Sequence, residues 1–271
     1  MTDVKVAIVT GASSGIGMET ALAFARRRYV VVLAARREEK LKEVGRACEA
    51  ASGGPVLVVP TDVARQEQVS ALVARTVERF GRLDVMVNNA GYGIFARVHQ
   101  TTDEQMRRIF DVNYFGVFYG CRAAAPVMIH QRSGHIFNVS SIIGKRGTPF
   151  HGAYCATKFA ICGLTDSMRV EMKPYNVRVT CVCPGLTGTG FPQHEEGGSS
   201  TERSSFRRLR TVQHPSVVAR KIVATVGRST PELLFTLGGR ALVFLSANFP
   251  RLGDWMMRLY HDDLAKGLKE R

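Results

Sequence analysis

Tyr154 and Lys158 are two residues whose types and spacing could do chemistry. They lie four positions apart in "GAYCATKFA" (152–160), a stretch predicted to be helical, and this spacing puts both side chains on one helix face. A nearby ammonium favours the phenolate form and lowers a tyrosine pKa, so the pair could donate and accept a proton. Two amphipathic side chains on a surface helix would show the same spacing, so other parts of the chain must decide between a catalytic pair and two surface residues.

A glycine-rich segment, "VTGASSGIG" (9–17), lies where a first strand is predicted to turn into a first helix. Gly11, Gly15 and Gly17 would permit a tight turn and let an anion approach the helix N-terminus, where free N–H groups favour phosphate. The spacing G-x-x-x-G-x-G differs from the G-x-G-x-x-G of the common dinucleotide fingerprint. The strand before it and the helix after it favour dinucleotide binding over a tight structural turn.

The end of the second predicted strand, in "VVVLAARREEK" (30–40), indicates which dinucleotide. An adenosine ribose with a free 2′-OH is usually held there by an acidic residue, whereas a 2′-phosphate needs a cation. Ala35 stands at the acidic position, and Arg36 and Arg37 follow it. Guanidinium groups suit bidentate phosphate recognition, so the pattern favours NADP(H) over two solvated surface arginines.

Short apolar runs that read as strands alternate with helical stretches. The runs are 4–10, 29–35, 55–61, 83–89, 134–140 and 177–183, with a candidate last strand at 232–236. Nearly continuous apolar strands are typical of a sheet buried on both faces, and the helical stretches between them include Gln66–Phe80 and Thr157–Lys173. We therefore predict an α/β fold: a single-domain, Rossmann-type, doubly wound parallel sheet with helices on both faces.

This catalytic domain is predicted to span 1–237, and 238–271 is predicted to be a C-terminal helical extension of it. A polar, Gly/Ser-rich segment at about 190–210 follows a strand directly and is interpreted as a substrate lid.

Polar groups follow several predicted strands, at the edge where open α/β sheets place ligands. They are Asp62 and Val63, the "NNAG" of 88–91, and Ser140 and Ser141. Asn113 is a polar residue among apolar ones in the helical stretch "FDVNYFGVF", so its amide is expected to have a specific role. Either it braces the backbone or it holds water near the site.

These motifs, in their order and spacing, resemble the short-chain dehydrogenase/reductase family over about residues 3–190. The matching elements are T-G-x-x-x-G-x-G at Thr10–Gly17, N-N-A-G at 88–91, an Asn 41 positions and a Ser 13 positions before the Tyr (Asn113 and Ser141), Y-x-x-x-K at Tyr154 and Lys158, and P-G-x-x-x-T at Pro184, Gly185 and Thr189. One departure is Thr187, where the family more often has Val or Ile.

The resemblance implies hydride transfer between nicotinamide C4 and a carbonyl carbon. It makes Tyr154 the proton donor or acceptor, Lys158 a ribose ligand that stabilises the phenolate, Ser141 a hydrogen-bond donor to the carbonyl oxygen, and Asn113 the holder of a water that relays protons from Lys158. The residues expected to bind NADP(H) are Gly11, Ser13, Ser14, Gly15, Ile16, Gly17, Arg36, Arg37, Asp62, Val63, Asn89, Ala90, Gly91, Tyr154, Lys158, Pro184, Gly185, Thr187 and Thr189. The histidines lack partners at triad or metal-site spacing and are read as structural or surface groups.

Composition limits the function classes. The chain has 271 residues, 45% of them hydrophobic, and a net charge of +14 from 37 basic and 23 acidic residues. No zinc-finger spacing or RNA-binding signature accompanies that charge, so nucleic acid is disfavoured as a partner.

The six cysteines form no C-x-x-C pair; Cys181 and Cys183 should share one strand face, and burial is favoured over a disulfide or a metal. Lacking an evident signal peptide or an apolar run of 18 residues, the chain is expected in the cytoplasm.

The favoured function is an NADP(H)-dependent carbonyl reductase or alcohol dehydrogenase for an apolar, lipid-like substrate. A non-catalytic NADP(H)-binding regulator or scaffold is the alternative. The resemblance also implies a homodimer or homotetramer that pairs through helices at about 102–128 and 153–173.

The C-terminal tail begins with a short apolar run, Ala241–Ala247, and shows an amphipathic pattern after Pro250. Its apolar residues follow the spacing of one helix face and are Leu252, Trp255, Met256, Leu259 and Tyr260, with Arg251, Arg258 and Lys266 around them. This face either packs on the domain or on a partner subunit and closes the substrate pocket, or it makes a peripheral contact with a membrane.

Overall fold

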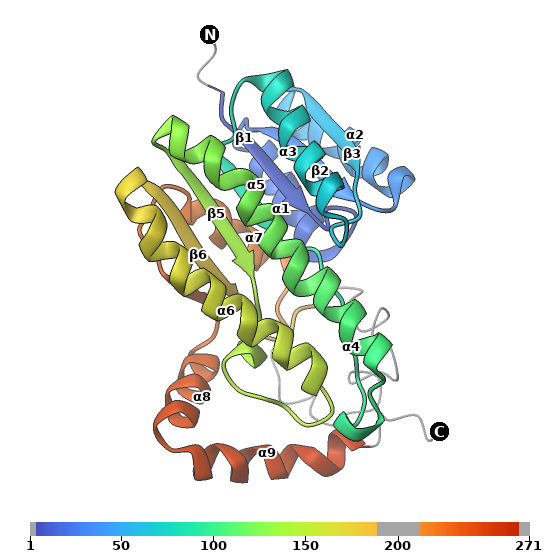
Figure 1. Ribbon diagram of the computed structural model, residues 1–271, viewed down its shortest axis with the longest axis vertical. Helices are drawn as coiled ribbons and strands as arrows, with labels where there is room; N and C mark the ends of the chain where they lie inside the picture. The colour runs from blue at the N-terminus through green and yellow to red at the C-terminus, as the bar shows by residue number, and fades with distance from the viewer. Residues whose placement is uncertain (1–3, 189–211, 266–271) are drawn as a thin grey trace.

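The computed structural model describes residues 4–188 and 212–265, and a parallel sheet of seven strands runs through this part of the chain (Figure 1). The strands are β1 (Val6–Thr10), β2 (Val30–Ala35), β3 (Val56–Pro60), β4 (Val85–Asn88), β5 (Gly134–Val139), β6 (Val177–Cys183) and β7 (Glu232–Leu234). Each lies within a run that the sequence marks as a strand. The strands can be recognised in the sequence because a strand covered on both faces must be apolar at nearly every position.

Nine α-helices occur in the described residues. They are α1 (Gly15–Ala25), α2 (Glu38–Ser52), α3 (Gln66–Phe80), α4 (Asp103–Phe110), α5 (Gly116–Gln131), α6 (Gly152–Met172), α7 (Pro215–Thr225), α8 (Leu237–Asn248) and α9 (Pro250–Ala265). The bounds predicted for α3 are confirmed. Helix α6 ends before Pro174, as expected, but begins at Gly152 rather than Thr157, which puts Tyr154 in its first turn.

Helices cover both faces of the sheet, which confirms the doubly wound α/β domain. Ile8 and Val9 are adjacent in β1 and fully buried, yet they belong to different apolar clusters because successive strand side chains point to opposite faces. The cluster around Val9 includes side chains of α1, α2 and α7, whereas the cluster around Ile8 includes side chains of α3, α5 and α6.

The strand order, β3-β2-β1-β4-β5-β6-β7, locates the site. The chain builds outward from β1 in one direction through β3 and then returns to the other side of β1 with β4. The loops after β1 and β4 therefore leave the sheet in opposite directions and open a crevice at its carboxyl edge. Helices α8 and α9 follow the sheet, from one residue before the predicted boundary at 238, and lie at the end of the molecule away from the N-terminus (Figure 1).

Candidate active site

The glycine loop between β1 and α1 has the backbone that an anion site needs. Gly11 (φ 66°) and Gly15 (φ 56°) adopt left-handed conformations that side chains disfavour. A Cβ on Gly17 would lie 2.2 Å from the Gly11 carbonyl oxygen, so only glycine permits this close approach. Ser14 is the N-cap residue of α1, and its side chain makes no capping hydrogen bond. The first N–H groups of α1 are thus suited to a phosphate, and the loop fits a dinucleotide.

Arg37 reaches this loop from the end of β2. Its Nη2 donates to the hydroxyl oxygens of Ser13 and Ser14, both at 3.0 Å. Arg36 beside it is exposed, and Ala35 ends the strand without a carboxylate. The structure therefore places a guanidinium and two hydroxyls together where a ribose 2′-substituent is expected.

The "NNAG" turn after β4 is tied to the end of β1. The backbone N–H groups of Asn89 and Ala90 donate to Thr10 Oγ1 at 2.9 and 3.1 Å, and Asn89 Nδ2 donates to the Thr10 carbonyl at 2.9 Å. After β3, Asp62 Oδ1 accepts from the Ala64 N–H at 3.1 Å. The three bonds to Thr10 join the turn after β4 to the end of β1, whereas the Asp62 bond lies within the loop after β3.

Asn113 is fully buried and braces the backbone that follows this turn. Its Oδ1 accepts from the Tyr92 N–H at 3.0 Å, and its Nδ2 donates to the Tyr92 carbonyl at 2.9 Å and to Thr157 Oγ1 at 3.2 Å. A Cβ on Gly91 would lie 3.0 Å from Asn113 Oδ1, so the turn approaches this amide closely. The bonds to Tyr92 are the backbone bracing that the sequence left as one alternative for Asn113.

Asn113 lies in a π-helix, Asp111–Phe115, between α4 and α5. The sequence predicts a helix here but does not reveal the π turn. Such turns are frequent at functional sites, but they are defined by backbone hydrogen bonding and leave no residue spacing by which to recognise them.

Tyr154 and Lys158 lie on α6 as predicted. Lys158 is 4% exposed, and its Nζ donates to the Val139 carbonyl at 2.9 Å and lies 5.4 Å from the centroid of the Tyr154 ring. Burial lowers the pKa of the Lys158 ammonium to about 8. The phenol, which is partly buried, thus has a cation close to one side of its ring.

Ser141 is the second residue after β5 and lies near the chain that leaves β6. Its Oγ donates to the Pro184 carbonyl at 3.5 Å and accepts from the Ile143 N–H at 3.4 Å, two long bonds that leave the hydroxyl able to reorient. Ser140 instead donates to the Lys158 carbonyl at 2.8 Å and is buried. Thr187 Oγ1 donates to the Gly185 carbonyl at 3.0 Å. Thr189 and the predicted lid at 190–210 lie outside the described residues.

His135 and the six cysteines, the other side chains that could react, are buried. His135 is buried beside Thr180, with Nε2 and Oγ1 2.8 Å apart, and burial lowers its pKa to about 3, so the ring stays neutral. All six cysteines are buried. The Sγ atoms of Cys181 and Cys183 lie 3.6 Å apart on one face of β6, as predicted, and Cys162 from α6 joins them within 4.8 Å, which sequence spacing did not indicate.

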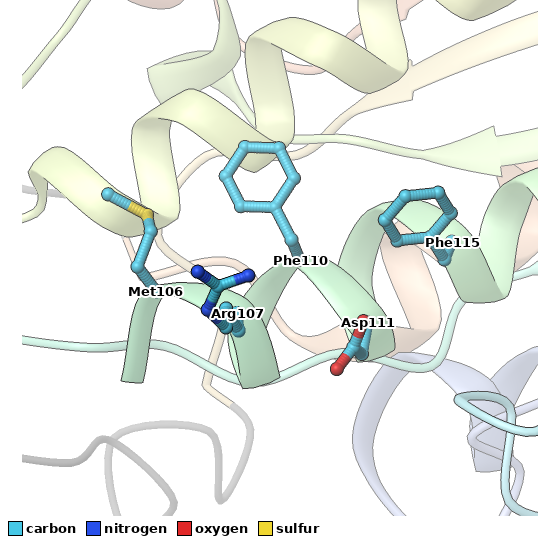
Figure 2. Close-up of a pocket in the computed structure, with 5 residues that line it drawn as sticks. All are labelled: Met106, Arg107, Phe110, Asp111 and Phe115. Carbon is cyan, nitrogen blue, oxygen red and sulfur yellow. The ribbon is translucent and has the colours of Figure 1, made fainter. Parts of the chain in front are cut away.

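A surface depression of about 470 Å³ lies on α4 and the π-helix (Figure 2). It is lined by Met106, Arg107, Phe110, Asp111 and Phe115. The predicted catalytic side chains do not line it. Two of its lining residues, Met106 and Phe110, pack in the same apolar cluster as Tyr154, and the depression lies in the range 102–128 that the family resemblance assigns to subunit pairing.

A doubly wound parallel sheet with an anion-binding glycine loop at its carboxyl edge defines a Rossmann-type nucleotide-binding protein. A model of the family described as "short chain dehydrogenase" matches residues 5–197. The chain is 34% identical to an uncharacterized oxidoreductase of Bacillus subtilis, YxnA, over 97% of this chain and 74% of that protein. It is 30% identical to a 3-ketodihydrosphingosine reductase of Bacteroides thetaiotaomicron, over 94% and 95% of the two chains.

Among solved structures, a short-chain dehydrogenase/reductase of Burkholderia phymatum in complex with NAD superposes with a TM-score of 0.82 at 28% identity, covering 92% of this chain and 95% of that one. The chain belongs to the short-chain dehydrogenase/reductase family. It is thus an oxidoreductase of the type that acts on alcohol or carbonyl groups with a nicotinamide cofactor.

Proposed function

We propose that this protein is an NADP(H)-dependent oxidoreductase that interconverts a carbonyl and an alcohol on an apolar, lipid-like substrate. The observation that carries the choice of cofactor is the position of Arg37, whose guanidinium lies 3.0 Å from both Ser13 and Ser14 at the glycine loop. A 2′-phosphate at this point would meet a cation and two hydroxyl donors. The structural relative with NAD shows that the fold also accepts the other cofactor, so the choice rests on these residues.

The bound cofactor would exchange a hydride with the substrate carbon, and the chain's own residues would manage the proton and the charge. Tyr154 would give its phenolic proton to the carbonyl oxygen in reduction and take it back in oxidation. Lys158 would stabilise the phenolate, because a buried ammonium interacts strongly in a medium of low dielectric. Ser141 would donate a hydrogen bond to the same oxygen as charge develops.

Asn113 has a positioning role in this scheme. Its amide fixes the backbone of Tyr92 and the hydroxyl of Thr157, one residue before Lys158. It thereby holds the turn after β4 against the helix that carries the catalytic pair. A water held for proton exchange with Lys158, as the family resemblance implies, remains part of the proposal.

Relatives that are oxidoreductases argue against the alternative, a non-catalytic NADP(H)-binding regulator or scaffold. One of them is a reductase of 3-ketodihydrosphingosine, which supports a ketone as the substrate group. The proposal also includes a homodimer or homotetramer paired through the helices at about 102–128 (α4, the π-helix and most of α5) and 153–173 (α6). It further includes a cytoplasmic location and a peripheral membrane contact of the C-terminal helices.

The test is a screen of ketones, aldehydes and alcohols of increasing chain length with NADPH, NADP⁺, NADH and NAD⁺. We expect turnover with the phosphorylated pair and kcat/KM that rises with the apolar length of the substrate. Turnover with NADH that equals or exceeds turnover with NADPH would refute the cofactor assignment, and absence of turnover with every pair would favour the regulator.

A further inference from the structure

Helices α8 and α9, with the residue that joins them, expose six large apolar side chains, which we call the apolar platform. They are Leu237, Phe244, Phe249, Leu252, Trp255 and Leu259. The two helices pack on each other, and α9 runs across the end of the molecule that lies away from the N-terminus (Figure 1). Large groups of exposed apolar side chains are uncommon on soluble monomers and mark a surface that binds something.

Packing against the domain does not explain these side chains, because α9 uses another side for that purpose. Met257 is buried, and Gly253 packs closely against Arg146. Trp255 and Leu259 are 56% and 58% exposed, and with Leu252 they follow the i, i+3, i+7 spacing of one helix face. The sequence left two alternatives for this face, packing on the domain or a partner subunit and contact with a membrane, and the chain's own domain leaves these three residues exposed.

The charges around the platform are compatible with an anionic surface. Arg240, Arg251 and Arg258 are all exposed on the same two helices. Of the three aspartates in α9, Asp254, Asp262 and Asp263, Asp254 already pairs with the cation Arg146. The whole chain carries +14, so long-range attraction acts in the same direction.

We propose that the apolar platform docks on the surface of an anionic lipid bilayer, with Trp255, Leu259 and their neighbours in the interface and the arginines at the headgroups. This combination of an aromatic and aliphatic face with nearby basic groups is what lets a helix lie in a membrane surface. The contact is peripheral: none of the described helices is long and apolar enough to cross a membrane.

A second copy of the chain is a poorer occupant of the platform. A two-fold contact would bring the same face of both copies together and place their three arginines near one another. Each copy also carries +14, so two approaching copies would repel each other through their net charge.

The platform is joined to the segment that leads from Ser141 to Tyr154, which gives docking a use that rests on the proposed function. Gly239 of α8 packs against Ile142 in this segment. The ring of His261 in α9 lies 5.0 Å from the ring of Phe150, between centroids. Helices α8 and α9 would therefore lie between a docked bilayer and the loop that carries the proposed oxyanion donor, at the end of the molecule where a lipid-phase substrate would arrive.

Trp255 makes the test direct, because it is the single tryptophan of the chain. The full-length protein is mixed with vesicles of phosphatidylcholine and phosphatidylglycerol, or of phosphatidylcholine alone, and its emission and co-sedimentation are measured at low and high salt. We expect a blue shift and pelleting with the anionic vesicles, weakened by salt because charge attraction is screened.

Matched variants locate the contact. Leu252→Glu changes a side chain that is 39% exposed on the platform, and Val4→Glu changes one that is 38% exposed near the other end of the molecule. We expect Leu252→Glu to weaken binding to anionic vesicles about tenfold or more, since it removes apolar contact and adds a repelled charge, and Val4→Glu to leave it unchanged. Equal binding of both variants would overturn the location.

Two outcomes would overturn the proposal itself. One is that the wild-type chain stays in the supernatant with both kinds of vesicle at low salt. The other is a blue shift that depends on protein concentration and not on lipid, which would assign the platform to a second copy. Because these readouts measure binding alone, they are independent of whether the protein reduces a carbonyl with NADPH.

Discussion

Arg37 Nη2 donates a hydrogen bond to the Ser14 hydroxyl at 3.0 Å, although the two residues lie 23 positions apart. The bond joins the end of β2 to the N-cap position of α1. It brings the guanidinium to the part of the crevice where the glycine loop is suited to phosphate, and a bound anion would replace hydroxyl partners with a stronger, charged acceptor.

Replacing both arginines should change cofactor selectivity. We expect Arg36→Ala with Arg37→Ala to weaken NADPH binding about ten- to a hundredfold, because a charge-assisted hydrogen bond contributes about 1.5–3 kcal/mol. NADH affinity, which involves no 2′-phosphate, is the internal control and should hardly change. Titration calorimetry measures both, and an unaltered NADPH affinity in the double variant would disprove the role of these residues.

Tyr154→Phe should abolish turnover and leave NADP(H) binding nearly intact, because the phenol is the proposed proton donor and not the main cofactor anchor. General acid catalysis typically raises the rate about 10²–10⁴-fold, so kcat should fall by about 10²-fold or more. Steady-state kinetics and cofactor titration check the two parts. Retention of more than about a tenth of kcat would count against the assignment.

Asn113→Ala should destabilise the fold by about 2–3 kcal/mol, because it removes three hydrogen bonds of a fully buried amide. Urea unfolding measures the change. Asn248→Ala is the control, since that amide makes an exposed bond to the Phe244 carbonyl and its loss should cost less than about 0.5 kcal/mol. A stable Asn113→Ala enzyme with reduced kcat would favour the catalytic-water alternative instead.

Lys158 should make stability depend on pH. Burial lowers the pKa of its ammonium from 10.5 to about 8 in the folded apo-protein. Between these two values the unfolded chain binds the extra proton, so stability rises with pH there, by up to about 1.4 kcal/mol per unit. Urea unfolding at several pH values should show this slope in the wild type and a smaller one in Lys158→Met. Equal slopes would mean that Lys158 titrates normally.

The proposed oligomer should depend on the face that carries the depression of Figure 2. Sedimentation at micromolar concentration is expected to show a dimer or tetramer, and Phe115→Glu, at a side chain that is 39% exposed, should shift it towards the monomer. Phe244→Glu on the apolar platform is the control and should leave assembly unchanged. A wild-type monomer would refute the oligomer, and loss of assembly only in Phe244→Glu would move the interface to the platform.

Much of the fold could be predicted from the sequence because its signals are local. A strand buried on both faces must be apolar throughout, so β1 to β7 are visible as runs, and α3 has the bounds that its periodicity indicates. The glycine loop is equally local, since Gly11 and Gly15 adopt conformations that other residues disfavour. The order of motifs along the chain was sufficient to indicate the family.

Contacts between distant residues were decided only by the tertiary structure. The spacing of Asn113 does not reveal that its amide bonds to Tyr92, and no residue pattern marks the π turn that holds it. Cys162 meets Cys181 because α6 packs on β6, which no interval in the sequence encodes.

The tail shows the same division. By itself the sequence determined that α9 has an apolar face, because helical periodicity is a property of neighbouring residues. Which side of α9 contacts the domain depends instead on where the rest of the chain places Arg146 and Phe150. The folded chain turns Met257 and Gly253 inward and leaves Trp255 exposed, since a helix that rests on a domain along one side can bury only that side.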